Sequence, residues 1–396
     1  MERRRFLQQS ALASGTFLVP SFVKASEGLF HQREGFRRLV VIQLSGGNDG
    51  LNTIVPHTND IYYGSRPKIA IKPNELIKVN DVLGFHPSLE PLVKLYDRGH
   101  LCVLNSVGYP NPDRSHFRST DIWHTASDSD QYLTSGWVGR YMEAQGKKPH
   151  GAIEIDDSLS LMLKGEKLNG IATTNPKLLY RNMNTPFFKQ VLRQQTDEHL
   201  SEHNLGYLYR TMIDAKSSAK YIHETTKTVT SKKDYPNNPF GKQLKTTAEF
   251  INSGLDTKVY YVSMGGFDTH ANQINSQSRL LAIYAEAMAS FVSDLEANNT
   301  FGDTLIMTFS EFGRRVRENA SWGTDHGAAN NVFVIGKDLK KPGFYNQAPD
   351  LTDLDANKDI KHRLDFREVY ATILDNWLGV PHGNIIGAKF DGLGFV

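Results

Sequence analysis

The sequence predicts an α/β fold in which helices cover both faces of a central, mostly parallel sheet. Residues 276–299 carry apolar side chains at helical spacing, between two apolar runs that resemble strands. A strand, a helix and a second strand in this order form the crossover of a parallel sheet. In all, five runs are continuously apolar, as is typical of strands covered on both faces. Each of them ends in, or lies next to, a cluster of polar residues and glycine. The runs fall within residues 38–50, 100–115, 258–270, 303–315 and 330–336.

Two further segments complete the predicted fold. Residues 365–379 are expected to form a helix, with Asp365 as its N-cap and Gly379 at its end. Residues of about 140–250 are more polar and show no clear strand pattern, so we expect a largely helical insertion there. Residues 39–396 would then form a single α/β domain that carries this insertion.

Length and composition narrow the class of protein. The chain has 396 residues, of which 39% are hydrophobic, so it can bury a substantial core. Its formal net charge of +2 depends on residues 1–25, which hold four basic residues and one acidic residue. The remainder is therefore close to neutral and lacks the basic field that a nucleic-acid partner would require.

Residues 1–25 predict a twin-arginine signal peptide. The pair Arg3-Arg4 is followed by a mildly apolar stretch over residues 11–23, and cleavage is expected after Ala25. The alternative is a membrane anchor or a plain first helix, but Pro20 interrupts the stretch and it is shorter than the ~20 residues of a spanning helix. We therefore expect export to the periplasm, or otherwise out of the cytoplasm, by the twin-arginine translocase, with no stable membrane span after cleavage.

Aspartate and histidine collect where the predicted strands end. Because sites in open α/β sheets form beyond the carboxyl ends of the strands, these clusters can converge in space. Carboxylate oxygen and imidazole nitrogen are usual ligands of divalent metals, so one or two ions of zinc, manganese, calcium or magnesium are expected. Each of these clusters alone has a plain alternative, since Asp-Gly is a turn signal and a lone Asp-His pair is usually a helix cap or solvated. The candidate ligands are Asp49, Asp268, His270, Asp325 and His326.

Ser115 is the candidate nucleophile. It stands where a helix would begin, and the exposed N–H groups and positive dipole of a helix N-terminus suit an attacking oxygen and an anionic substrate. The alternative is that Ser115 is only an N-cap. The next residue, His116, is a candidate proton donor, metal ligand or structural hydrogen-bonding group. The candidates for holding substrate oxygens are Arg114, Asn48 and Arg314, although exposed arginines near carboxylates usually form surface ion pairs.

An ordered set of motifs resembles a known family. The motifs are RRRFLQQSA, VVIQLSGGNDGLNT, DRSHFRSTDIW, MGGFDTHANQ, FSEFGRRVREN, GTDHGAANNVFVIG and DFREVYATILDNWLG. Together they resemble the exported bacterial proteins grouped as domain of unknown function 1501, from about Leu39 to the C-terminus. That family looks like a distant branch of the alkaline phosphatase and sulfatase superfamily, so the resemblance implies an alkaline-phosphatase-like fold.

The resemblance also assigns expected roles. It implies that Asp49 is a metal ligand after an early strand, that Ser115 stands at the nucleophile position, and that two Asp/His pairs supply further ligands. Two features depart from the superfamily pattern. Asp268 and His270 are two residues apart rather than four, and only His362 and His382 are available as a last histidine ligand.

Two functions are open at this point. The first is an exported metal-dependent hydrolase or transferase that acts on a phosphate or sulfate ester, either a small molecule or a glycan ester. The second is a non-catalytic binding or assembly protein that keeps the fold, with or without one metal.

Overall fold

A nine-stranded sheet forms the centre of the protein. A computed structural model describes residues 36–193 and 203–396, so the expected signal peptide lies outside the described residues. The strands follow the order β11-β5-β10-β9-β1-β8-β6-β7, with β12 also paired to β5. Their bounds are β1 Arg38–Leu44, β5 Leu101–Gly108, β6 Ala152–Glu154, β7 Ile171–Ala172, β8 Val259–Met264, β9 Thr304–Phe309, β10 Asn330–Ile335, β11 Gly343–Phe344 and β12 Leu364–Asp365.

The sheet is mostly parallel, as predicted. Strand β1 pairs in parallel with β8, where Leu39 lies opposite Val259, and with β9, where Arg38 lies opposite Thr304. Strand β10 is the exception, because it runs antiparallel to both β5 and β9. All five predicted strands are present, and every residue of β1, β5, β9 and β10 is buried.

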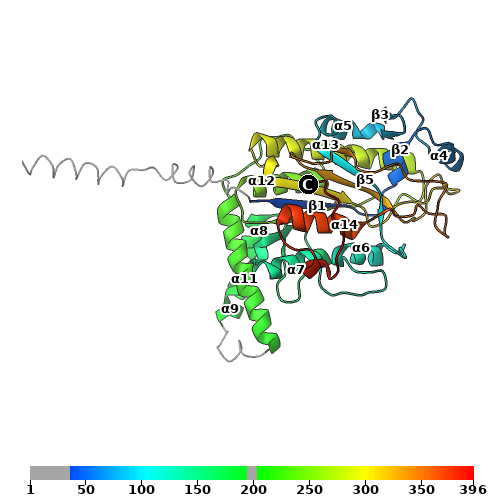
Figure 1. Ribbon diagram of the computed structural model, residues 1–396. Coiled ribbons are helices and arrows are strands. Elements are labelled where there is room, and N and C mark those ends of the chain that lie inside the picture. The colour runs from blue at the N-terminus through cyan, green and yellow to red at the C-terminus, as the bar shows by residue number, and fades with distance from the viewer. Residues whose placement is uncertain (1–35, 194–202) are drawn as a thin grey trace, which may run out of the picture. The chain divides into compact units, whose positions relative to one another are not determined.

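Helices cover both faces of the sheet, which confirms the predicted layers. Alternate side chains of β1 point to opposite faces, so Val40 and Ile42 join one hydrophobic cluster and Leu39 and Val41 join another. The first cluster includes residues of α5 Glu90–Asp97, α12 Pro239–Asn252 and α13 Gln273–Ala297. The second includes residues of α6 His116–Thr125, α7 Trp137–Ala144 and α14 Phe366–Thr372. Figure 1 shows α5 and α13 on one side of the sheet and α6, α7 and α14 on the other.

The segment 140–250 is mainly helical, but it also adds two strands to the central sheet. Its helices are the end of α7, then α8 Pro176–Asn182, α9 Pro186–Arg193, α11 His203–Thr226 and α12. Strand β6 pairs in parallel with β8 and with β7, so this part of the chain extends the sheet rather than lying wholly outside it. With three and two residues, β6 and β7 are too short to show a strand pattern in the sequence.

The C-terminal helix begins and ends where the sequence predicts. The Asp365 side chain accepts a hydrogen bond from the backbone of Arg367 and forms a capping box with Glu368. After Thr372 the helix continues as a π-helical turn, Ile373–Leu378, and Gly379 closes it in the left-handed conformation at φ 70°. Among the described residues, none of the helices combines the length and the apolar character needed to cross a membrane.

A smaller sheet of three strands is formed by segments that follow the first strand in the chain. It consists of β2 Ile54–Pro56, β4 Leu83–Phe85 and β3 Ile77–Lys78. The short helices α3 Gly50–Thr53 and α4 Asp60–Ser65 stand on either side of β2 in the chain, and α15 Gly383–Ile386 lies near the C-terminus.

The strand directions bring the polar clusters to one edge of the sheet. The carboxyl ends of β1, β5, β8 and β9 all lead out at this edge, because these strands run the same way. Strand β10 runs the other way, so the residues before Asn330 meet that same edge. The five loops at residues 45–49, 109–115, 265–272, 310–315 and 319–329 are therefore neighbours in space.

Candidate metal centre

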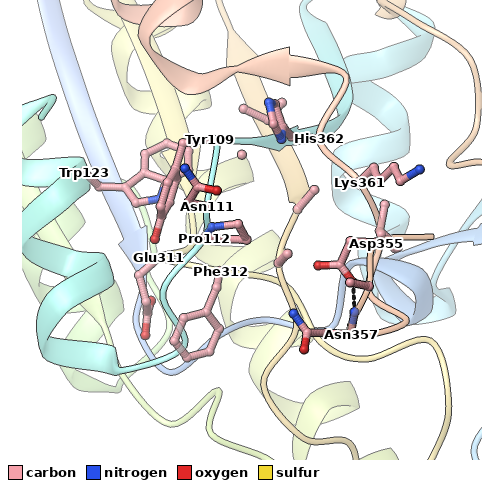
Figure 2. Close-up of a pocket in the computed structure, with 16 residues that line it drawn as sticks. Tyr109, Asn111, Pro112, Trp123, Glu311, Phe312, Asp355, Asn357, Lys361 and His362 are labelled. Atoms are coloured by element: carbon pink, nitrogen blue, oxygen red, sulfur yellow. Dashed lines mark hydrogen bonds between the residues drawn. The ribbon is translucent and has the colours of Figure 1, made fainter. Parts of the chain in front are cut away.

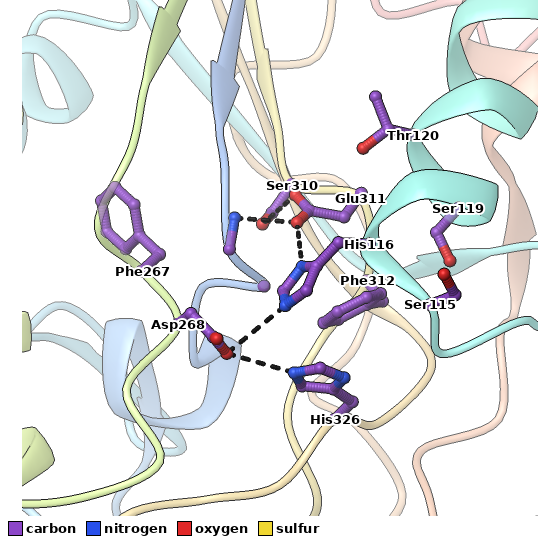
Figure 3. A network of polar contacts seen from close by, with 12 residues as sticks. Ser115, His116, Ser119, Thr120, Phe267, Asp268, Ser310, Glu311, Phe312 and His326 are labelled. Carbon is purple, nitrogen blue, oxygen red and sulfur yellow. Dashed lines mark hydrogen bonds and ion pairs between the residues drawn. The ribbon is translucent and has the colours of Figure 1, made fainter.

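Three histidines surround one carboxylate oxygen at this edge. Asp268 Oδ1 lies 3.1 Å from the Nε2 atoms of both His270 and His326, and 3.4 Å from Nε2 of His116. The three histidines come from different places: His116 from the first turn of α6, His270 from the loop after β8, and His326 from the loop before β10. Figure 3 shows His116 and His326 converging on Asp268 from two sides.

Each of these histidines is oriented through its other ring nitrogen. Nδ1 of His116 lies 2.9 Å from Oε1 of Glu311, and Nδ1 of His270 lies 3.2 Å from Oδ1 of Asp325. Nδ1 of His326 lies 2.8 Å from the backbone carbonyl of Arg114. A carboxylate or carbonyl oxygen only accepts, so in every case Nδ1 carries the proton and Nε2 keeps its lone pair when the ring is neutral.

The atoms that face the centre fit a divalent cation. Nε2 of His270 and Nε2 of His326 are 2.9 Å apart, a distance at which two lone pairs repel unless a proton or a cation lies between them. The buried Nε2 of His116 makes no hydrogen bond within the described residues. Ligand atoms of His116, Asp268 and His326 all lie within 4.8 Å of one another, and imidazole nitrogen with carboxylate oxygen is a common set for zinc and similar metals.

Nearby charges keep Asp268 ionised. Burial alone would raise the pKa of Asp268, but the hydrogen bond from the Arg314 guanidinium and the contact with His326 outweigh burial and lower the pKa to about 2. The Glu311 carboxylate raises the pKa of His116, whereas burial lowers the pKa of His326. The centre therefore presents a stable carboxylate next to at least one histidine that favours the neutral form, as metal ligands must.

The structure does not bring Asp49 into this centre. Its Oδ2 lies 2.6 Å from a guanidinium nitrogen of Arg66 and 2.5 Å from Nε2 of Gln273, and its Oδ1 accepts backbone N–H groups that begin α3. Both oxygens of Asp49 are thus occupied, and the side chain is only 1% exposed. It serves as a buried N-cap and as the partner of a buried arginine, which the sequence pattern does not distinguish from a metal ligand.

Asp325 stands one step behind the expected ligands. Its Oδ1 is 3.2 Å from Nδ1 of His270 and also accepts a hydrogen bond from Asn319. That hydrogen bond from Asn319 is the largest cause of the lowered pKa of Asp325. Asp325 therefore orients His270 and does not face the centre itself.

The three candidates for holding substrate oxygens are engaged elsewhere. The guanidinium of Arg314 is buried and donates to the carbonyls of Gly47 and Thr324 and to Asp268. Arg114 pairs through its side chain with Asp359, and Asn48 is 2% exposed within a buried network. Arg314 thus holds Asp268 in place. Arg114 contributes to the centre through its backbone carbonyl, which lies 2.8 Å from Nδ1 of His326 and orients that ring.

Ser115 stands at the N-cap of α6, as expected, but its hydroxyl makes no capping hydrogen bond there. The residue is exposed and directly precedes His116. In Figure 3 the Ser115 hydroxyl points toward Ser119 rather than toward Asp268. The chain thus places this hydroxyl beside the centre without directing it inward.

The two candidates for a last histidine ligand also lie apart. His382 pairs with Asp375 near the C-terminal helix. His362 lines a cavity next to the centre and makes no contact with the three histidines among the described interactions.

The residue that sequence reasoning passed over is Glu311. It directly follows β9, is 1% exposed, and accepts hydrogen bonds from His116 and from the backbone N–H of Gly46. Glu311 could have been found from its position, because it follows Ser310 at the end of a buried strand. The same edge of the sheet carries the other polar clusters. The Glu311 carboxylate therefore orients the His116 ring.

Comparison with known proteins agrees with the motifs. The family described as "Protein of unknown function (DUF1501)" matches residues 36–390. The chain belongs to this family. No curated protein matches the chain.

Solved structures with similar folds are distant in sequence. The lipoteichoic acid synthase LtaP from Listeria monocytogenes is 8% identical with a TM-score of 0.41, over 90% of this chain and 76% of that one. The sulfatase PsFucS1 from Pseudoalteromonas sp. is 12% identical with a TM-score of 0.40, over 94% and 74%. The phosphonate monoester hydrolase SpPMH from Silicibacter pomeroyi is 8% identical with a TM-score of 0.40, over 89% and 77%.

Proposed function

We propose that this protein is an exported metal-dependent enzyme that hydrolyses or transfers a phosphate or sulfate ester. The observation that carries the proposal is the convergence of three histidine Nε2 atoms on Oδ1 of Asp268, each histidine being fixed by an acceptor at Nδ1. A structural cluster of histidines would not need three separate acceptors that all turn the Nε2 lone pairs inward. Such outer partners are characteristic of histidines that ligate metals.

The proposed ligands are His116, Asp268, His270 and His326, and the metal is zinc, manganese, calcium or magnesium. Histidine-rich coordination favours zinc among these. When bound, such an ion polarises an ester oxygen and lowers the pKa of a coordinated water. Glu311 and Asp325 would keep His116 and His270 in the orientation and protonation state that coordination requires.

The N-terminus of α6 would receive the anionic group of the ester. The helix spans ten residues, and the Ser115 side chain accepts no hydrogen bond from its first-turn N–H groups. Unpaired N–H groups and the positive end of the helix dipole favour an anion at this place. Ser115 Oγ is exposed at the same point, so it is our proposed nucleophile, with His116 next to it at the centre.

The test is turnover by the mature protein with and without metal. We expect the metal-loaded protein to cleave at least one of p-nitrophenyl phosphate, bis(p-nitrophenyl) phosphate and p-nitrophenyl sulfate, and a chelator to abolish that cleavage. Asp268→Asn should remove both metal and turnover, whereas Ser115→Ala should remove turnover and keep the metal. Turnover that survives Ser115→Ala would transfer the role of nucleophile to a water. Turnover that survives Asp268→Asn would refute the metal-dependent mechanism.

A second function is favoured by specific observations. The Ser115 hydroxyl is not directed at Asp268, and all three guanidinium nitrogens of Arg314 already donate to acceptors in the described part of the chain. Both fit a non-catalytic binding or assembly protein that keeps one metal. Stoichiometric metal, together with no turnover of any ester in the panel, would favour this reading.

Export is part of the proposal. Arg3-Arg4 and the apolar stretch after them support the twin-arginine route to the periplasm. Replacing both arginines with lysine should keep the precursor in the cytoplasm, as cell fractionation would show. Unchanged export of that variant would rule out the route.

A further inference from the structure

A cavity of about 510 Å³ lies directly beside the candidate metal centre. Glu311 and Phe312, which follow β9, belong to the wall of the cavity and also contact the centre. The Phe312 ring lies 4.9 Å from the His116 ring and 4.5 Å from the His326 ring, measured between centroids. Figure 2 shows the cavity between the loop that carries Asn111 and Pro112 and the loop that carries Asp355 and Asn357.

The wall offers hydrogen-bond donors that the protein itself does not use. Nε1 of Trp123 is buried and makes no hydrogen bond within the described residues, although the side chain is only 2% exposed. The side chains of Asn111 and His362 likewise make no hydrogen bond or ion pair in the part of the chain that the structure describes. Asn111 and His362, on two different segments, therefore offer the cavity polar groups that no other described residue occupies, whereas Nε1 of Trp123 lies behind the surface of the wall.

The same wall carries acceptors and no excess of positive charge. Glu311 and Asp355 are carboxylates, and the one lysine of the wall, Lys361, is already paired with Asp353. An anionic group would therefore not be favoured inside this cavity. Tyr109, Pro112 and Ile360 add apolar surface between the polar groups. A ligand that suits this wall has closely spaced groups that both donate and accept, and an uncharged apolar body.

We propose that the cavity binds the uncharged, hydroxyl-rich alcohol part of the substrate, so the substrates are phosphate or sulfate esters of sugars. This rests on the proposed function, because the ester's anionic group is assigned to the metal centre and the sugar to the adjoining cavity. Sugar hydroxyls accept from Asn111 and His362 and donate to Asp355, whose Oδ2 accepts no hydrogen bond within the described residues. The volume of the cavity is within the range of about 300–1,000 Å³ that is typical of small-molecule sites.

The test measures binding of neutral sugars, which needs neither an ester nor turnover. The metal-loaded protein would be titrated with glucose, galactose, mannose, fucose, N-acetylglucosamine and the common disaccharides of these, with ligand-observed NMR as the readout. We expect at least one of them to bind in the millimolar range or tighter. Ala356→Phe fills the cavity from an exposed wall position, and Asn111→Gly removes a donor where φ is 52°, a conformation that glycine adopts without strain. Each variant should weaken binding by about tenfold or more, in line with the loss of a wall contact.

Matched controls separate this inference from the proposed function. Asn299→Gly makes the same change at φ 57°, outside the cavity wall, and should leave sugar binding unchanged. Metal content should be unaffected in all three variants. If no sugar of the panel binds, or if Ala356→Phe and Asn111→Gly leave binding unchanged, the assignment of the cavity is wrong. Sugar binding without turnover of any ester would keep the cavity and reject the enzymatic function.

Discussion

At the scale of single residues, the histidines around Asp268 are oriented by the hydrogen-bond acceptors at their Nδ1 atoms. Glu311, Asp325 and the Arg114 carbonyl each accept from one Nδ1, and this turns three Nε2 atoms toward one carboxylate oxygen. Without these acceptors the rings could rotate or exchange tautomers, and the ligand set would lose its geometry. The charge and the position of Glu311 therefore matter as much as those of a ligand.

Glu311→Gln tests this role. The amide keeps the shape of the side chain but lacks the charge, and one side of it would face the donors of Gln43 and Ser310. We expect metal affinity to fall about 10–100-fold, with the fold retained. Competition with a chromogenic chelator measures the affinity. Glu286→Gln on the exposed side of α13 is the control, and equal affinities in the two variants would show that Glu311 does not support the centre.

Asp49→Asn separates a structural aspartate from a ligand. Arg66 would lose its charged partner at a fully buried position, so we expect the free energy of unfolding to fall by roughly 1–3 kcal/mol. Bound metal per folded chain should stay the same. Asp268→Asn should instead lose the bound metal and leave the free energy of unfolding nearly unchanged, because that side chain is half exposed and the metal depends on it. Loss of metal in Asp49→Asn, measured on folded protein, would restore Asp49 to the ligand set.

The residue scale also shows what the sequence can and cannot predict. That His270 and His326 lie at one edge of the sheet could be predicted, since both stand next to the ends of predicted strands. Which carboxylate faces the centre could not, because Asp49, Asp268 and Asp325 all lie beside glycine-containing turns. The structure is needed to show that the Asp49 carboxylate is paired with Arg66 and that the Asp325 carboxylate lies next to Nδ1 of His270.

At the scale of elements, length decides what the sequence reveals. The apolar runs of β1, β5, β8, β9 and β10 and the periodic pattern of α13 are long enough to be recognised. Strands β6 and β7 are not, although they extend the sheet beyond β8. The antiparallel direction of β10 also leaves no trace in its side chains, because a strand buried on both faces looks alike in either direction.

Strand β6 gives a prediction about pH. It ends at Glu154, which is 4% exposed, and burial raises the pKa of this carboxyl to about 7. In the unfolded chain the carboxyl ionises near its ordinary value of 4.5, so between these values the folded state binds more protons than the unfolded state. Stability should therefore fall by about 2–3 kcal/mol as pH rises from about 5 to 8.

Chemical denaturation at several pH values checks this behaviour. Glu154→Gln removes the titrating group, so its stability should decline less over the same range of pH than that of the natural protein. Glu286→Gln, at an exposed position, should follow the natural curve. Parallel curves for the Glu154 variant and the natural protein would mean that this carboxyl does not titrate in the range.

At the scale of the whole molecule, strand direction assembles the centre. The loops after β5, β8 and β9 and the loop before β10 bring His116, Asp268, Glu311 and His326 to one edge from positions up to 210 residues apart in the chain. The convergence of strand-end clusters could be predicted from the rule that parallel strands share a carboxyl edge. Its exact membership depends on side-chain packing, of which Phe312 between the centre and the cavity is one example.

The most direct test of the central claim is metal content. Elemental mass spectrometry would be applied to the mature protein purified from its export compartment, with Asp268→Ala and Asp325→Ala beside it. We predict a near-stoichiometric divalent metal that Asp268→Ala loses, and that Asp325→Ala binds more weakly but still takes up when metal is in excess. A folded protein that carries no metal and takes up none on titration, or an Asp268→Ala variant that keeps it, would contradict the account.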